Sequence, residues 1–277
     1  MQNAAFAQLG FNWRYLAFEV DPAHLREAIL GAKRMKFIGL NLTVPHKLLA
    51  LELVDTLDAS ARQWGAVNTI RFEAATASGE WRALGSFTDS IPEDIRSQGF
   101  NTDADAITRS IEEDLSLRLA GTKVLLLGAG GAGRVAALKL AAENVSELYL
   151  VNRTRSKAEA VAAEIAKRFP ECTASVGYPK GSINLVINAT SLGLKPDDQS
   201  PLDEAQFSLR SADAVYDMIY RPAETPLLRA AREAGCRTAN GLGMLLYQGA
   251  KALEIWTGKT APIEIMRRAL SKNIYGS

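Results

Sequence analysis

Short apolar runs alternate with amphipathic stretches in the middle of the chain. Residues 124–127 are continuously apolar and end at Gly128, which is typical of a strand buried on both faces of a parallel sheet. Residues 134–143 then carry apolar side chains at helical spacing, 148–151 form a second apolar run, and 156–168 form a second amphipathic stretch. This order of strand, glycine turn, helix, strand and helix predicts one half of a dinucleotide-binding domain.

The same patterns extend toward both ends of the chain. After the first nucleotide-binding half they predict a helix–strand alternation with strands at 185–188 and 214–218, a polar loop at 194–206, and helices at 225–234, 242–256 and 262–270. Before it they predict strands at 16–20 and 37–43, helices at 22–32, 46–57 and 104–119, and an inserted polar loop at 85–99. Alternating strands and helices indicate the α/β fold class.

Composition narrows the range of functions. The 277 residues include 32 basic and 31 acidic side chains, and the resulting net charge of +1 argues against an extended nucleic-acid surface. Two cysteines cannot form a disulfide scaffold, and with only two histidines no metal site is expected. No apolar run approaches the length of a membrane span, and the first residues lack a secretory signal pattern. We therefore expect a cytoplasmic enzyme that binds neither nucleic acid nor a membrane.

A glycine motif follows the first buried strand of the nucleotide-binding half and opens the next helix. Such glycines allow a tight turn and a close backbone approach to a pyrophosphate, which the free N–H groups of the helix start then bind. The alternative is a glycine-rich turn that only packs a helix against a strand. The motif G-x-G-x-x-G consists of Gly128, Ala129, Gly130, Gly131, Ala132 and Gly133.

The end of the second strand indicates which dinucleotide is bound. An NAD site usually has an acidic residue there, which accepts from the ribose 2′-OH. Here Asn152, Arg153, Thr154 and Lys157 occupy that stretch without a carboxylate, and cationic side chains suit a 2′-phosphate. An ordinary basic helix start is the alternative, but positive charge there opposes the helix dipole. We therefore expect NADP(H) as the cofactor.

Hydride transfer to a ketone needs a proton partner, such as a lysine beside a carboxylate. The string NLTVPHK closes a predicted strand and places Thr43 and Lys47 at its carboxyl end, where sites in α/β proteins form. The strings GAVNTI and NTD contribute further polar groups in turns, among them Asn68 and Asp103. On spacing alone, Lys47 is a solvated lysine at a helix start and Asp103 a helix N-cap.

Eight strings together resemble the shikimate dehydrogenase family. They occur in the order typical of the family and span nearly the whole chain. They are NLTVPHK (41–47), GAVNTI (65–70), NTD (101–103), GAGGAG (128–133), NRT (152–154), NATSLG (188–193), YDMIYRPAETPLL (216–228) and GLGMLLYQGA (241–250).

The resemblance implies roles for individual positions. Lys47 and Asp103 match the catalytic pair at the reacting oxygen, where the lysine exchanges the proton and the aspartate orients it. Thr43, Asn68 and Gln248 match groups that bind the ring hydroxyls of the substrate, and Tyr220 matches a tyrosine near it. For Gln248 a structural bond to a neighbouring backbone is the alternative. The positions expected at the cofactor are the glycine motif, Asn152, Arg153, Thr154, Lys157, Thr190, Met218 and Gly241.

The resemblance also implies two domains. Residues 1–104 and 241–277 are expected to form an α/β substrate-binding catalytic domain, and residues 105–240 a Rossmann-like NADP-binding domain. The function implied is an NADP-dependent shikimate dehydrogenase that reduces 3-dehydroshikimate to shikimate. Two alternatives are a quinate/shikimate dehydrogenase paralogue and a weakly active nucleotide-binding regulatory protein. The expected oligomeric state is a monomer or a homodimer.

The chain departs from the family pattern at two places. Family members begin with a strand and a Ser-x-Ser-Pro loop ending in His-Asn; this chain opens at Met1-Gln2-Asn3, where Asn3 matches the end of that loop. We expect a misplaced start, a fragment, or a substrate carboxylate that is bound otherwise. The second departure is the insertion before the NTD string, in which Thr88-Asp89 competes with the pair that contains Asp103. The helical stretch after Asp103 favours Asp103.

Overall fold

The computed structural model describes residues 1–88, 90–195 and 197–276, and the chain divides into two compact units. Unit 1 contains Met1–Asp103 and Leu246–Ser277, and unit 2 contains Ala104–Leu245. Among the described residues, no helix combines the length and the apolar character that a membrane crossing needs. Asp89, one member of the competing Thr-Asp pair, lies outside the described residues.

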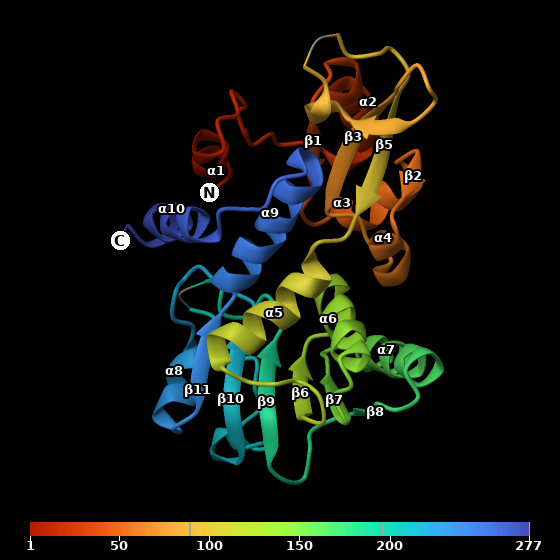
Figure 1. Ribbon diagram of the computed structural model, residues 1–277. Coiled ribbons are helices and arrows are strands. Elements are labelled where there is room, and N and C mark those ends of the chain that lie inside the picture. The colour runs from red at the N-terminus through yellow and green to blue at the C-terminus, as the bar shows by residue number, and fades with distance from the viewer. Residues whose placement is uncertain (89, 196, 277) are drawn as a thin grey trace. The chain divides into compact units, whose positions relative to one another are not determined.

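Unit 1 is built around a mixed sheet with strand order β1-β3-β5-β2, and β4 pairs with the free part of β3 (Figure 1). The central strand β3 is antiparallel to both β1 and β5, while β2 runs parallel to β5. The strands are β1 (Gly39–Asn41), β2 (Thr56–Leu57), β3 (Thr69–Ala75), β4 (Trp81–Ala83) and β5 (Ile95–Phe100).

Helices cover this sheet and bury its apolar side chains. Ile70 and Phe72 of β3 pack in one core with Leu25 and Ile29, because the apolar positions of α2 recur at helical spacing. The helices are α1 (Gln2–Gln8), α2 (Leu25–Arg34), α3 (His46–Leu49), α4 (Ala59–Trp64) and α10 (Ile263–Tyr275), with single 3₁₀ turns at Pro22–His24, Ala50–Glu52 and Leu84–Ser86.

Unit 2 contains an all-parallel sheet of six strands in the order β11-β10-β9-β6-β7-β8. In chain order this is the 3-2-1-4-5-6 arrangement of a doubly wound dinucleotide-binding fold, so the Rossmann-like prediction is confirmed. The strands are β6 (Lys123–Leu127), β7 (Glu147–Val151), β8 (Thr173–Val176), β9 (Ile183–Asn188), β10 (Ala212–Asp217) and β11 (Arg237–Asn240).

The neighbouring strands β6 and β9 are buried at nearly every position, as is typical of a parallel sheet that helices cover on both faces. β6 and β9 are neighbours although β7 and β8 come between them in sequence, so the chain reverses direction across the sheet at this point. In such folds, ligands bind outside the carboxyl ends of the strands at this reversal. The helices are α5 (Asp103–Leu115), α6 (Gly131–Ala142), α7 (Arg155–Arg168), α8 (Pro226–Glu233) and α9 (Leu242–Thr257), of which α5 begins and α9 ends in unit 1.

Three of the expected elements of unit 1 are wrong. Residues 16–20 form no strand, and Leu16 and Phe18 are 65% and 64% exposed. The helix expected over 46–57 ends early, because Thr56 and Leu57 pair with Gln98 and Gly99 as strand β2. The loop expected over 85–99 contains most of β5, whose hydrogen bonds to β3 hold a polar segment in the middle of the sheet.

Candidate active site

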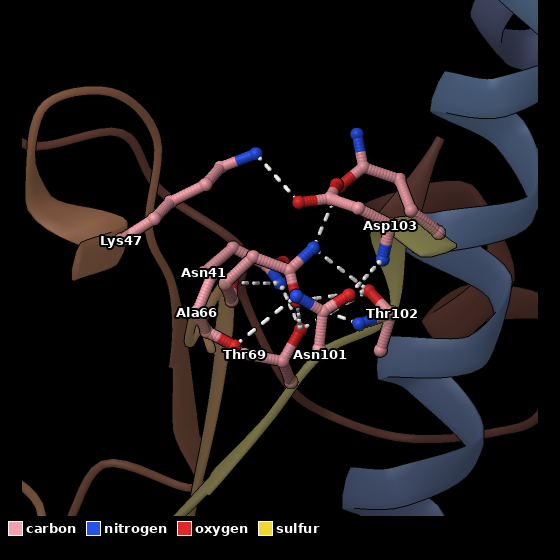
Figure 2. Close-up of polar contacts among 9 residues, drawn as sticks. Asn41, Lys47, Ala66, Thr69, Asn101, Thr102 and Asp103 are labelled. Carbon is pink, nitrogen blue, oxygen red and sulfur yellow. Dashed lines mark hydrogen bonds and ion pairs between the residues drawn. The ribbon is translucent and has the colours of Figure 1, made fainter. Parts of the chain in front are cut away.

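Lys47 and Asp103 form an ion pair in unit 1. The Lys47 Nζ atom donates to Asp103 Oδ2 at 2.8 Å, and the two side chains are 23% and 8% exposed (Figure 2). Lys47 lies in α3, whose position is fixed by the bond from the Val67 amide to the Lys47 carbonyl oxygen. Asp103 opens α5 directly after β5, and its amide donates to Asn101 Oδ1. The pair is therefore held by backbone contacts on both sides.

The second carboxylate oxygen of this pair is unsatisfied. Asp103 Oδ1 is buried and has no hydrogen-bond partner among the residues described. A buried acceptor without a partner is costly, because the atom has lost its hydration without replacement. This oxygen is therefore ready to accept a hydrogen bond from a hydroxyl group of a ligand. The side chain does not act as the helix cap that spacing alone suggested, since its other oxygen is paired with Lys47.

A chain of amide and hydroxyl groups lies beside the ion pair. Asn68, which is buried, donates from Nδ2 to Thr102 Oγ1 at 3.0 Å and to Gln248 Oε1 at 3.2 Å. Its Oδ1 accepts from the Thr102 amide at 2.8 Å. Gln248 belongs to α9, and its Oε1 accepts from a side chain 180 residues away in sequence. Lys47, Asp103, Asn68 and Gln248 are thus brought together within unit 1.

Two residues of this cluster were not singled out from the sequence. Asn101 donates from Nδ2 to the Ala66 carbonyl oxygen, and Asn41 donates to Thr69 Oγ1 at 2.9 Å (Figure 2). The Asn41 bond ties β1 to β3, and the Asn101 bond ties the end of β5 to the turn before β3. Both asparagines stand inside the strings NTD and NLTVPHK, which is the only signal for them in the sequence.

Thr43 and Tyr220 belong to the turns that follow β1 and β10. Thr43 is exposed in the turn between β1 and α3, and its carbonyl oxygen accepts from the His46 amide. Tyr220 belongs to unit 2, follows β10 and is half-buried. Their expected roles at the substrate stay predictions.

The glycine motif of unit 2 forms a closely packed turn at the start of α6. A side chain at Gly133 would lie 2.1 Å from the carbonyl oxygen of Gly128, so the first turn of α6 can pack this closely only with glycine. Gly130 and Gly131, in contrast, face open space on the outer side of the turn. Gly130 caps α6 without a side-chain hydrogen bond, which leaves the N–H groups of the helix start available for an anion.

The turn after β7 presents positive charge. Arg153 and Lys157 are exposed and form no ion pair within the described residues, whereas Arg155 is paired with Glu159. Asn152 connects this turn to the glycine motif, since its Oδ1 accepts from the Ala129 amide and its Nδ2 donates to the Thr154 carbonyl oxygen. Unpaired cations at the start of α7 fit a doubly charged phosphate group.

Three further residues expected at the cofactor lie at the carboxyl ends of strands in unit 2. Thr190 follows β9, and its amide and hydroxyl both donate to Asn188 Oδ1. Met218 follows β10, and its amide donates to the Asn188 carbonyl oxygen. A side chain at Gly241 would lie 2.1 Å from the Met218 carbonyl oxygen, so these two segments are in direct contact.

Comparison with known proteins decides the family. Models for the shikimate dehydrogenase substrate-binding domain, shikimate/quinate 5-dehydrogenase and the shikimate 5′-dehydrogenase C-terminal domain match residues 1–70, 110–191 and 241–270. A shikimate dehydrogenase (NADP⁺) of Methanopyrus kandleri is 37% identical over 99% of this chain and 90% of its own length. The chain belongs to the shikimate dehydrogenase family.

Two solved structures of shikimate dehydrogenases share the fold. One, in complex with NADP⁺, has a TM-score of 0.82 and 35% identity, with 99% of this chain and 89% of the other covered. The other, from Thermus thermophilus in complex with NADP(H) and shikimate, has a TM-score of 0.79 and 32% identity, with 98% and 92% covered. The resemblance drawn from the eight sequence strings is therefore confirmed at the level of family and fold.

Proposed function

We propose that the protein is an NADP-dependent shikimate dehydrogenase, an oxidoreductase that reversibly reduces 3-dehydroshikimate to shikimate. The observation that carries the proposal is the Lys47–Asp103 pair, in which one carboxylate oxygen binds the ammonium and the other is buried without a partner in the described part of the chain. Family membership supports the reaction class, because the relatives above are named for it.

Lys47 and Asp103 supply the proton chemistry. Bound NADPH supplies the hydride that reduces the ketone carbon. Lys47 then offsets the negative charge that grows on the ketone oxygen and delivers the proton to it, and in the reverse direction it takes the proton from the hydroxyl. Asp103 holds the ammonium in place through Oδ2, and its free Oδ1 accepts from a hydroxyl of the substrate. This bond would satisfy the buried Oδ1 atom of Asp103 in the complex.

The neighbouring amides orient the ring of the substrate. Gln248 and Asn68 present donors and acceptors beside the ion pair. Because Asn68 Nδ2 is divided between Thr102 and Gln248, a substrate hydroxyl that accepts from it replaces one of these two bonds. Thr43 and Tyr220 are assigned to the same substrate on the strength of the family motifs alone.

The residues of unit 2 hold NADP. The start of α6 binds the pyrophosphate, and Arg153, Thr154 and Lys157 bind the 2′-phosphate, with Asn152 fixing the two turns relative to each other. Thr190, Met218 and Gly241 are assigned to the nicotinamide end. Residues 105–240 are accordingly the NADP-binding domain, and residues 1–104 with 241–277 the catalytic domain.

The proposal includes the cellular compartment and the oligomeric state of the enzyme. Both cysteines are free and buried, as is usual for proteins of a reducing compartment, and we assign the enzyme to the cytoplasm. It works there as a monomer or a homodimer, which sedimentation equilibrium would distinguish.

A spectrophotometric assay tests the function directly. Purified protein is mixed with shikimate and NADP⁺, and reduction is followed by the absorbance of NADPH, with quinate and NAD⁺ in parallel reactions. We expect turnover with shikimate and a kcat/KM that favours NADP⁺ over NAD⁺. Preferred turnover of quinate would support the paralogue, and NADPH binding without turnover of either acid would support the regulatory protein.

A further inference from the structure

A buried carboxyl group lies at the carboxyl end of β10 and takes no part in the chemistry described above. Asp217 is 0% exposed, and no lysine, arginine or histidine of the described residues pairs with it. Three donors surround it: Asn188 Nδ2 at 2.9 Å and the Ile219 amide at 3.0 Å reach Oδ1, and Thr225 Oγ1 at 2.6 Å reaches Oδ2. A fully buried carboxyl group without a counter-ion is rare, because only hydrogen bonds such as these offset the cost of its lost hydration.

Asn188 links Asp217 to the turn after β9 through hydrogen bonds. Its Nδ2 donates to Asp217 and also to the Leu192 carbonyl oxygen at 3.1 Å. Its Oδ1 accepts from both the amide and the hydroxyl of Thr190, at 2.9 and 2.7 Å. Asp217 and the Leu192 carbonyl oxygen together hold the nitrogen of the Asn188 amide, and this sets the direction of the oxygen that accepts from Thr190.

Asp217 also accepts hydrogen bonds from two more segments, the turn after β10 and the start of α8. Its bond to the Ile219 amide closes the turn that contains Met218, whose own amide donates to the Asn188 carbonyl oxygen. On the other side, Thr225 caps α8 by accepting from the Leu228 amide while it donates to Asp217. One carboxyl group therefore connects the ends of β9 and β10 with the start of α8.

The turn held by Asn188 lies directly against the glycine motif. A side chain at Gly128 would lie 3.0 Å from the Ala189 carbonyl group and equally close to the methyl group of Thr190. A movement of this turn by a few tenths of an ångström would therefore alter the space beside the nucleotide-binding glycines.

We propose that Asp217 is a positioning residue for the nicotinamide end of the cofactor, acting through Asn188 and the Ile219 amide on the turns that carry Thr190 and Met218. This inference rests on the proposed function, because it takes NADP(H) as the ligand of unit 2. Asp217 touches neither reacting atoms nor phosphate, so its effect falls on the half of the dinucleotide that lies by the strand ends, and the 2′-phosphate end is unaffected.

The adjacent residue on the same strand provides a matched control. Tyr216 is also fully buried, and its hydroxyl lies 2.8 Å from Ser110 Oγ. Successive residues of a strand point to opposite faces, so this hydrogen bond lies on the other side of the sheet from Asp217. Tyr216→Phe removes a buried hydrogen bond from β10 without touching Asn188 or Thr190.

The test compares two ligands with Asp217→Asn, which keeps the shape and loses one acceptor. Dissociation constants for NADPH and for 2′,5′-ADP, which lacks the nicotinamide, are measured by calorimetry. We expect Asp217→Asn to weaken NADPH about tenfold, or about 1.4 kcal/mol, and to leave 2′,5′-ADP unchanged. Tyr216→Phe should leave both constants unchanged. If Asp217→Asn does not fold, Thr225→Val with Thr225→Ser as its conservative partner gives the same comparison, and only the valine variant should weaken NADPH.

Other outcomes contradict the inference in distinguishable ways. Unchanged NADPH binding in folded Asp217→Asn, or equal weakening of NADPH and 2′,5′-ADP, would overturn the positioning role and leave the proposed function intact. An equal loss of NADPH affinity in Tyr216→Phe would attribute the effect to the general stability of the sheet. That result would also overturn the positioning role of Asp217. Wild-type protein that binds neither ligand would overturn the proposed function, and the positioning role with it.

Discussion

Lys47 and Asp103 are 56 residues apart in sequence, yet their charged atoms lie 2.8 Å from each other. The two side chains come from different elements, the short helix α3 and the first residue of α5. Their contact depends on β1, β3 and β5 being paired in one sheet, because these strands deliver both elements to the same edge.

Replacing Lys47 tests the proton-transfer role. Lys47→Met keeps much of the apolar stem and removes the ammonium, so kcat for shikimate oxidation should fall by about 10²–10⁴-fold. The dissociation constant of NADPH should stay unchanged, since the cofactor residues lie in unit 2. Lys33→Met is the control, because Lys33 forms a similar ion pair with Asp55 at 2.9 Å elsewhere in unit 1. Normal turnover in Lys47→Met would remove the lysine from catalysis.

Replacing Arg153 tests the choice of cofactor. Arg153→Ala should raise KM for NADPH by about ten- to hundredfold through lost charge-assisted bonds to the 2′-phosphate, and should leave KM for NADH nearly unchanged. Arg155→Ala provides the comparison two residues further on, where the guanidinium is already paired with Glu159. Equal effects of the two substitutions, or equal losses for both cofactors, would mean that Arg153 does not recognise the phosphate.

The two thiols should be unreactive in the folded protein. Burial raises the pKa of the Cys172 thiol to about 11 from an ordinary value of 9.0, and burial together with Asp213 also raises the pKa of Cys236. At pH 8 the thiolate fraction of Cys172 is then about a hundredfold lower than that of a free cysteine. Alkylation monitored by mass spectrometry should be slow in buffer and complete in guanidinium chloride. Rapid labelling of the native protein at either position would contradict the burial described here.

The contribution of Asp217 to the free energy of unfolding should fall as the pH rises. Burial raises the pKa of this carboxyl above its ordinary 3.8, so the folded protein holds the proton more tightly than the unfolded chain does. The contribution of the group is therefore complete below about pH 3.8 and is lost as the pH rises through the folded-state pKa. Urea unfolding of the wild type and of Asp217→Asn is measured at about pH 4.5 and about pH 8. The unfolding free energy of the wild type minus that of the variant should be smaller at the higher pH. A difference that grows with pH would mean that the folded-state pKa is lowered.

Sequence patterns predicted unit 2 better than unit 1. The central strands β6 and β9 were located because strands buried on both faces read as continuous apolar runs. β7 was also located from its apolar run, although its burial alternates along the strand, and β10 is buried over its last four residues. The outer strand β11 was missed, since Arg237–Asn240 carries polar residues and forms a strand only through its pairing with β10. The same reason hid β5 in unit 1, where Arg96 is satisfied by the buried Glu73 of β3.

The candidate site could be predicted in part. Lys47 and Asp103 followed from the family strings, whereas their spacing alone favoured a surface lysine and a helix cap. The network around Asn101 and Asn41 was not predicted, because the bonds that give these amides their place join backbone and side-chain groups of separate strands. Asp217 stood inside a recognised string, but its isolation from any cation is visible only in three dimensions.

Asn152 connects the glycine motif to the positively charged turn after β7 through both polar atoms of its amide. Its oxygen already meets the Ala129 amide, while its nitrogen meets the Thr154 carbonyl oxygen beside the positive turn. Exchanging that nitrogen for oxygen, as in Asn152→Asp, would keep the link to the glycine motif but lose the donor to Thr154, so that two oxygens would repel each other beside the turn proposed to bind the phosphate. A single nitrogen atom of one side chain thus holds the backbone of the positively charged turn in register with the glycine motif.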